Sequence, residues 1–268
     1  MQVTFKINGE TVKAEWRENL LKVARKEGFY IPTLCYHEAL SPYGACRLCL
    51  VEVVEPSGRR RITTSCTYPV EEGIEVFTDS ERVLRNRRMV LELLLTRAPD
   101  APVLRRLAEE MGIERPRFDP IGEDGRGCIL CGLCVRVCSE AIGANAIGFA
   151  GRGTRREVTT PFHIQADACI GCGACAEVCP TGVIKVEDTP DGKRILSYWN
   201  TTIALTKCEL CGRYFAPEPG MERTKARLEE ALGVELPEDM LGICPECRRK
   251  EFGRKMIIVE PSDLREEV

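Results

Sequence analysis

Hydrophobic and polar residues alternate along residues 2–14, on both sides of the dipeptide Asn8-Gly9. Strict alternation is typical of a strand with one buried face, and Asn-Gly is a preferred turn between two such strands. Residues 18–28 instead repeat their apolar positions at helical spacing and end on Gly28, as helix C-termini often do. The chain is therefore predicted to open with a hairpin and a helix.

Two apolar runs further along the chain, residues 47–55 and 73–77, predict more strands. With the hairpin and helix they predict a small sheet with one packed helix in residues 1–78. Residues 80–97 carry their apolar side chains on one helical face, and Ser80 is a suitable N-cap residue. A long amphipathic helix is therefore predicted after the sheet.

Three segments are predicted to follow the small-sheet domain. Residues 79–120 form a helical linker that prolines interrupt, and residues 121–200 contain two dense runs of cysteine. Residues 201–268 contain the last four cysteines, with a charged helix at 221–234 between the two pairs. The predicted fold class is α+β, built from these four modules.

Charge is nearly balanced, with 38 Lys and Arg against 41 Asp and Glu, which argues against a nucleic-acid partner. Local basic clusters at 57–62 and 85–89 are interpreted as a solvated loop and the outer face of a helix. Apolar runs such as residues 89–95 are too short to span a bilayer, so no direct membrane insertion is expected.

Cysteine dominates the chemistry of the chain, with 16 cysteines against two histidines. A secreted disulfide scaffold is usually shorter and carries a signal peptide, whereas this sequence opens directly on a predicted strand. Tight cysteine clusters in an intracellular protein indicate metal binding or catalysis. We therefore expect a cytoplasmic metal-binding protein whose ligands are almost all thiolates.

Eight of the cysteines form an internal repeat, because Cys128–Cys138 and Cys169–Cys179 share the spacing C-x2-C-x2-C-x3-C. In two-cluster bacterial ferredoxins the fourth cysteine of each run binds the other cluster. The crossed assignment predicts two [4Fe–4S] ligand sets, Cys128, Cys131, Cys134 and Cys179 for the first and Cys138, Cys169, Cys172 and Cys175 for the second. A pair of zinc knuckles is the alternative, which two matching runs disfavour.

A second kind of quartet, Cys35, Cys46, Cys49 and Cys66, lies in the small-sheet domain. Its spacing, C-x10-C-x2-C-x16-C, keeps the central C-x2-C of plant-type ferredoxins and lengthens the first gap. Four thiolates on loops of one small sheet suit a [2Fe–2S] cluster, with zinc as the alternative.

The last quartet, Cys208, Cys211, Cys244 and Cys247, consists of two C-x2-C turns. Two such turns close a tetrahedron of thiolates, which is the usual form of structural zinc. A fourth Fe–S cluster or a single rubredoxin-type iron remains open for the same ligands. Zinc in a zinc-ribbon-like module is the favoured prediction.

Three stretches resemble a known family, namely IPTLCYH at 31–37, GACRLCLVEV at 44–53 and TSCTYPVEEGIEV at 64–76. They are similar to the N-terminal region of the large iron–sulfur subunit of respiratory complex I, to the small diaphorase subunit of NAD-reducing hydrogenases and to the N-terminus of iron-only hydrogenases. The two cysteine runs extend the resemblance to about residue 185. It implies a β-grasp [2Fe–2S] ferredoxin domain, a 2x[4Fe–4S] ferredoxin-like domain and a role in carrying electrons to or from a flavin subunit.

The sequence also departs from that family. Members usually bind an extra [4Fe–4S] cluster through one histidine and three cysteines after the first helix, but residues 67–127 contain neither residue type. Either the remaining clusters are close enough for direct transfer, or the path is rearranged. His37 lies two residues from Cys35 and is interpreted as a loop residue rather than a partner of the cluster ligands.

No complete glycine-rich nucleotide motif, P-loop or nucleophile–base pair is visible, so we expect no flavin or NAD on this chain. The predicted function is a non-catalytic electron-transfer subunit of a soluble multi-subunit NAD(P)-linked oxidoreductase, such as a hydrogenase or formate dehydrogenase. It would relay electrons between a flavin/NADH-binding diaphorase subunit and a catalytic oxidoreductase subunit. Its expected cofactors are one [2Fe–2S] cluster, two [4Fe–4S] clusters and one zinc ion or fourth cluster. The alternatives are a structural or assembly protein carrying several zinc sites, and a free-standing enzyme.

Overall fold

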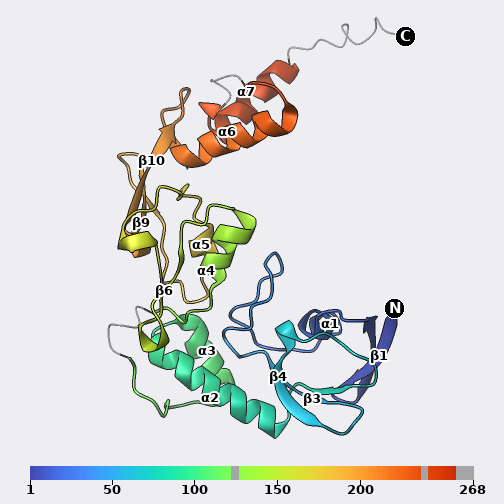
Figure 1. Ribbon diagram of the computed structural model, residues 1–268. Coiled ribbons are helices and arrows are strands. Elements are labelled where there is room, and N and C mark those ends of the chain that lie inside the picture. Colours follow the sequence, from blue (N-terminus) through green and yellow to red (C-terminus); the bar gives the residue numbers. More distant parts are fainter. Residues whose placement is uncertain (122–126, 237–240, 258–268) are drawn as a thin grey trace, which may run out of the picture. The chain divides into compact units, whose positions relative to one another are not determined.

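The chain divides into two compact units, whose helices and strands are labelled in Figure 1. The computed structural model describes residues 1–121, 127–236 and 241–257. One unit joins Met1–Thr159 to Ala174–Ile184, and the other joins Thr160–Gly173 to the chain from Lys185 onward. The predicted module boundaries after residues 78, 120 and 200 stay predictions.

Five strands of the first unit form one mixed sheet in the order β2-β1-β5-β3-β4. Asn8 and Gly9 take positive φ angles of 49° and 87° between β1 and β2, so the predicted hairpin and its tight turn are confirmed. β1 pairs in parallel with β5, and the other pairs are antiparallel. The strands are β1 (Gln2–Ile7), β2 (Glu10–Glu15), β3 (Leu50–Val54), β4 (Arg60–Thr64) and β5 (Glu75–Phe77).

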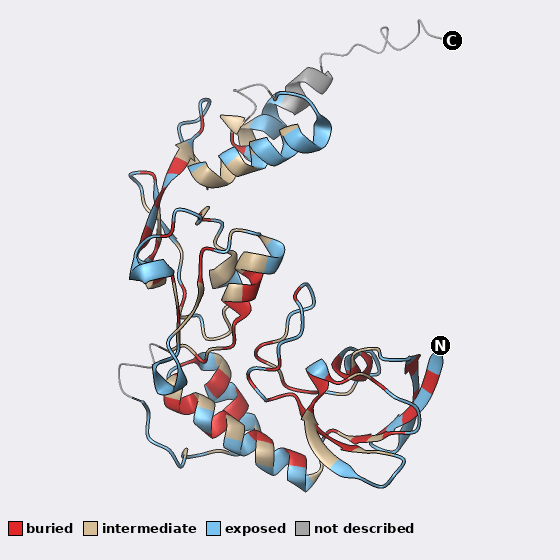
Figure 2. Cartoon of the chain, in the orientation of Figure 1, coloured by how far each residue is buried: buried red, intermediate tan, exposed pale blue. Residues whose placement is uncertain are grey.

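Helix α1 (Leu20–Lys26) packs on this sheet, as the spacing of its apolar residues predicts. The side chain of Asn19 accepts the N–H of Lys22 and caps the N-terminus. Gly28 follows the helix at a φ of 85°, which an L side chain rarely adopts. The inward-facing residues of α1 and of the strands form one hydrophobic core. Figure 2 shows buried residues on α1 and β1 in red.

Two further helices, α2 (Glu81–Arg97) and α3 (Pro102–Glu110), follow the sheet in the same unit. Ser80 accepts the N–H of Val83 through its hydroxyl, so the predicted N-cap is confirmed. The apolar faces of both helices build a second hydrophobic core, which also contains Cys35, Cys46 and Cys131. In the described part of the chain, no helix is both long and apolar enough to cross a membrane.

The basic run at 85–89 is only partly the outer face of a helix. Arg85 and Arg88 are exposed, as predicted, but Arg87 is 4% exposed and points into the unit. The prediction was wrong for Arg87 because helical spacing places it one turn after Val83 and one turn before Leu91, both fully buried.

The first unit is completed by short elements around the cysteine runs. Helix α4 (Leu133–Arg136) continues into one π-helical turn, Val137–Ala141, where Ser139 stands in place of the proline that follows Cys179 in the second run. The remaining elements are the 3-10 turns Ser65–Thr67 and Gly153–Arg155, the paired strands β6 (Gly148–Ala150) and β7 (Glu157–Thr159), and helix α5 (Ala174–Glu177).

The second unit has a four-stranded antiparallel sheet in the order β11-β10-β9-β8. Helix α6 packs beside β10 and β11. It spans Glu218–Leu232, so the charged helix predicted at 221–234 is confirmed. No residue of α6 is buried. The elements are β8 (Glu187–Asp188), β9 (Lys193–Leu196), β10 (Thr201–Lys207), β11 (Tyr214–Pro217), α6 (Glu218–Leu232), α7 (Pro245–Ile257) and the 3-10 turns Pro161–His163 and Ser197–Trp199.

Candidate metal centres

The four cysteines of the small-sheet domain meet as two pairs of buried thiols. Cys35 lies in the loop after α1, Cys46 and Cys49 precede β3, and Cys66 lies in the turn after β4. A hydrogen bond with the thiol of Cys46 lowers the pKa of Cys35 to about 6, and one with Cys66 lowers the pKa of Cys49 to about 7. One member of each pair is therefore readily a thiolate, the form that binds iron.

The two pairs also lie close enough for the charges of one to act on the other. The pKa of Cys66 is raised by its hydrogen bond to Cys49 and by burial, and further by the charges of Cys49, Cys35 and Cys46. In addition, the backbone N–H of Cys46 donates to the sulfur of Cys35 at 3.4 Å. Two sulfur pairs around one buried volume fit a cluster with two irons, because each iron then takes two thiolates.

Two buried arginines, which sequence reasoning missed, contact the loops that carry this quartet. Arg87 donates from Nε and Nη2 to the carbonyl of Leu50, at 3.1 and 2.5 Å. Arg136 donates from Nη2 to the carbonyl of Cys35 at 2.6 Å and from Nη1 to the carbonyl of Ser41. Helical spacing would have revealed Arg87, but nothing in the sequence places Arg136 beside Cys35.

The first predicted [4Fe–4S] set lies within the first unit. Cys131 and Cys134 are buried, Cys128 and Cys179 are half-buried, and the N–H of Leu130 donates to the sulfur of Cys128 at 3.4 Å. Burial raises the pKa of Cys131 to about 12, and the charges of Cys128 and Cys179 raise it further. Burial also raises the pKa of Cys134, and the charges of Cys131, Cys128, Cys179 and Cys175 raise it further. The charges of Cys179 and Cys175 both reach the first run, and the crossed assignment stays a prediction.

Gly132 shapes the loop between two of these ligands. It has a φ of 71°, and a Cβ atom there would lie 3.1 Å from the ring of Phe149 and 3.3 Å from that of Tyr43. Both the backbone angle and the close rings therefore require glycine. The packed loop keeps the ligands on a short, rigid segment.

The second predicted [4Fe–4S] set is divided between the units, so it stays a prediction. Cys138 and Cys175 belong to the first unit, where the N–H of Ala146 donates to the sulfur of Cys138 at 3.4 Å. Cys169 and Cys172 belong to the second unit.

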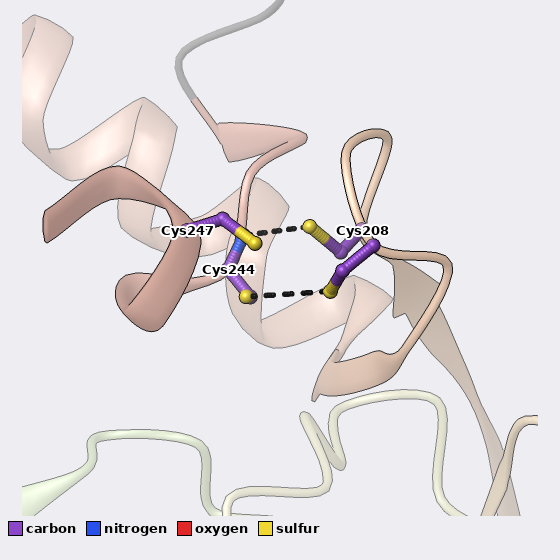
Figure 3. A group of neighbouring side chains, drawn as sticks. Cys208, Cys244 and Cys247 are labelled. Atoms are coloured by element: carbon purple, nitrogen blue, oxygen red, sulfur yellow. Dashed lines mark hydrogen bonds between the residues drawn. The ribbon is translucent and has the colours of Figure 1, made fainter. Parts of the chain in front are cut away.

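The last quartet closes around a single small volume. Its four sulfurs all lie within 4.8 Å of one another, and those of Cys211 and Cys244 are 3.9 Å apart. Zinc–sulfur bonds of 2.3 Å in a regular tetrahedron place the sulfurs about 3.8 Å apart. Figure 3 shows the sulfurs of Cys208, Cys244 and Cys247 turned toward a common centre. A cubane would hold its ligands farther apart, because four irons and four sulfides lie between them.

Backbone N–H groups lower the pKa values of two thiols in this quartet, which favours the thiolate form that binds metal. The N–H of Cys244 donates to the sulfur of Cys208 at 3.3 Å and lowers the pKa of Cys208 to about 6. The pKa of Cys244 is lowered by the backbone N–H of Cys247. The two C-x2-C turns are joined by an ion pair between Arg213 and Glu246. The donor set and its spacing fit one tetrahedral ion.

Two contacts attach the described end of the segment that lacks cysteine and histidine to helix α2. Arg117 pairs with the buried carboxylate of Glu92 on α2, and the N–H of Ile121 donates to the carbonyl of Thr96 at 2.7 Å. His37, in turn, accepts the N–H of Ala39 through Nδ1 at 3.2 Å and so stabilises its own loop.

Comparison with known proteins places these sites in context. A 2Fe-2S iron-sulfur cluster binding domain matches residues 1–81, and a 4Fe-4S dicluster domain matches residues 127–183. The alpha subunit of the NADPH-Fe(3+) oxidoreductase of Geobacter sulfurreducens is 37% identical over 180 residues, covering 59% of this chain and 21% of the relative. The mitochondrial 78 kDa subunit of the NADH-ubiquinone oxidoreductase of Candida albicans is 32% identical over 183 residues, covering 59% and 25%.

A chain in a crystal structure of an NAD+-reducing [NiFe]-hydrogenase in the H2-reduced state is also similar. The TM-score is 0.51 at 32% identity, and the match covers 59% of this chain and 74% of that one. By contrast, the chain spans only about a fifth to a quarter of the length of the curated relatives it matches.

Proposed function

Because the chain belongs to the family of iron–sulfur proteins that includes the large complex I subunit and the similar chain of NAD+-reducing hydrogenase, we propose that it is the electron-transfer subunit of a multi-subunit NAD(P)-linked oxidoreductase. Its partners would be a flavin/NADH-binding subunit and a catalytic subunit, in the cytoplasm. The N-terminal domain would have the β-grasp fold, to which the parallel pairing of β1 with β5 and the packed helix α1 are suited.

One observation carries this proposal. Cys35 and Cys46 of the first quartet and Cys131 of the first [4Fe–4S] set are side chains of one hydrophobic core. The charge of Cys35 even contributes to the raised pKa of Cys131, after burial and the nearer thiolates. Iron–sulfur clusters, when bound, supply one-electron transfer, and ligand sets in one dry core hold the two centres close. This arrangement favours direct transfer, without the histidine-ligated cluster.

The chain's own residues supply the environment of the clusters. The core of α2 and α3 encloses the buried thiols, and backbone N–H groups donate to the sulfurs of Cys128 and Cys35. The buried guanidinium of Arg136 adds a positive charge at the carbonyl of Cys35. Burial, local charge and hydrogen bonds to sulfur are the terms by which a protein adjusts a reduction potential.

For the last quartet, we propose one structural zinc ion rather than a fourth cluster. The spacing of its sulfurs supports a closed mononuclear site, and such sites usually stabilise a fold rather than carry electrons.

Metal and sulfide analysis of the full chain, purified without oxygen, tests the proposal. We expect about ten irons with matching sulfide, for one [2Fe–2S] and two [4Fe–4S] clusters, and reducible EPR signals of both kinds. Absence of both signals would refute the electron-transfer function. Sulfide-free protein rich in zinc would instead favour a structural or assembly protein, and NADH oxidation by the isolated chain would favour a free-standing enzyme.

A further inference from the structure

Arg87 is a buried cation beside the first quartet. It lies on the face of α2 that packs against β3, is 4% exposed, and directs two N–H groups at the carbonyl of Leu50, the residue after Cys49. Its neighbours on the helix surface, Arg85 and Arg88, are exposed. Of Arg85, Arg87 and Arg88, the fold therefore buries only Arg87.

Arg87 has no ion pair among the described carboxylates. The ion pairs of α2 are Arg82 with Glu52 and Glu92 with Arg117, and Arg87 takes part in neither. A buried charge is unfavourable unless an opposite charge and hydrogen bonds compensate it. The carbonyl of Leu50 accepts hydrogen bonds from Arg87 but supplies no opposite charge.

The quartet is the candidate source of that negative charge. Burial lowers the pKa of Arg87 to about 10, and the charge of Cys49 leads those that raise it, ahead of Tyr30 and Asp79. The guanidinium therefore stays protonated at neutral pH. Four thiolates around two irons carry net negative charge, so a cluster held by Cys49 supplies the compensation that the protein alone does not.

We propose that Arg87 is the internal counter-charge of the [2Fe–2S] site and holds the reduction potential of that site high. The inference rests on the proposed function. On reduction the site gains one electron from its donor, no bond forms or breaks, and its net charge becomes one unit more negative. A fixed cation beside Cys49 stabilises the reduced form more than the oxidised form. Arg87 is thus a positioning and potential-setting residue, not a ligand.

Redox titration of the full chain, followed by the [2Fe–2S] EPR signal, tests this proposal. Arg87→Gln keeps a donor for the Leu50 carbonyl and removes the charge, whereas Arg87→Lys keeps the charge. We expect Arg87→Gln to lower the reduced-to-oxidised ratio at fixed potential at least tenfold, about 59 mV for a one-electron couple. Arg87→Lys should stay within threefold of the wild type, and the [4Fe–4S] signals should not shift.

Arg85→Gln is the matched control, because it removes the same charge from the exposed face of the same helix. Equal ratios for the wild type and Arg87→Gln, or an equal shift in Arg85→Gln, would overturn the proposal. Loss of the signal in both Arg87 variants but not in Arg85→Gln would also overturn it, because the role would then be structural. Absence of the signal in the wild type would instead refute the proposed function.

Discussion

The last quartet makes the sharpest prediction about metal. Cys211→Ser replaces the exposed ligand of the four and leaves the three other cysteines in place. All four wild-type sulfurs lie within 4.8 Å of one another. The 3.9 Å between Cys211 and Cys244 is close to the separation of about 3.8 Å that four zinc–sulfur bonds require. We therefore expect one zinc per wild-type chain and none retained by Cys211→Ser, while iron stays at about ten per chain.

The metal also bears on the stability of the surrounding segment. No residue of α6 is buried, and the ion pair that joins the two turns, Arg213 with Glu246, is about half exposed and so weak. Structural zinc contributes folding energy outright. Hydrogen exchange of Cys211→Ser should thus show loss of amide protection around β10, β11 and α6, and little change in the first unit.

Elemental analysis for zinc, iron and sulfide is the assay. Leu210→Ser is the matched control, because Leu210 lies in the same turn, is 53% exposed and is no ligand. Iron well above ten per chain with no zinc would refute the assignment, since the quartet would then hold a cluster or a single iron. Retention of zinc by Cys211→Ser would refute the closed tetrahedron.

Three further predictions concern the first unit. Cys179→Ser should remove about four irons and one [4Fe–4S] EPR signal if the sets are crossed, whereas unchanged iron would refute the crossing. Gly132 has a φ of 71° and lies against two rings, so Gly132→Ala should lower the free energy of unfolding by about 1–2 kcal/mol in a denaturant titration and lower the iron content. Gly112→Ala is the control: Gly112 has a φ of 66° in open space, and this variant should keep all the iron. Leu91 is fully buried in the shared core, so Leu91→Ala should lower the free energy of unfolding by about 2–5 kcal/mol and weaken the [2Fe–2S] and [4Fe–4S] EPR signals together. Leu93 is 49% exposed, so Leu93→Ala should change neither the stability nor the signals.

Much of the fold was predictable from local pattern. The hairpin at Asn8-Gly9, the cap at Ser80 and the charged helix are short-range features, and each depends on residues within one or two turns. The resemblance to the complex I and hydrogenase subunits is likewise confirmed, because cysteine spacing is specific. The individual ligand sets and the domain boundaries remain predictions.

What the sequence did not reveal depends on contacts between distant segments. Arg136 and Cys35 are about a hundred positions apart, and no local pattern links a helix in one cysteine run to a loop of the small sheet. Arg87 was missed for another reason, since a run of charges was interpreted by composition rather than by helical phase. The spacing of the last four sulfurs is also a property of folded geometry, which C-x2-C motifs alone do not determine.

The core shared by the two kinds of ligand has a consequence for maturation. Leu34 and Leu48 pack with Cys35, Cys46 and Cys131, so the same apolar side chains enclose thiols of both proposed sites. We expect iron and sulfide to reach these thiols before the core closes or when it opens. Opening of this core would expose thiols of both sites together. We therefore expect insertion of one cluster to favour insertion of the other.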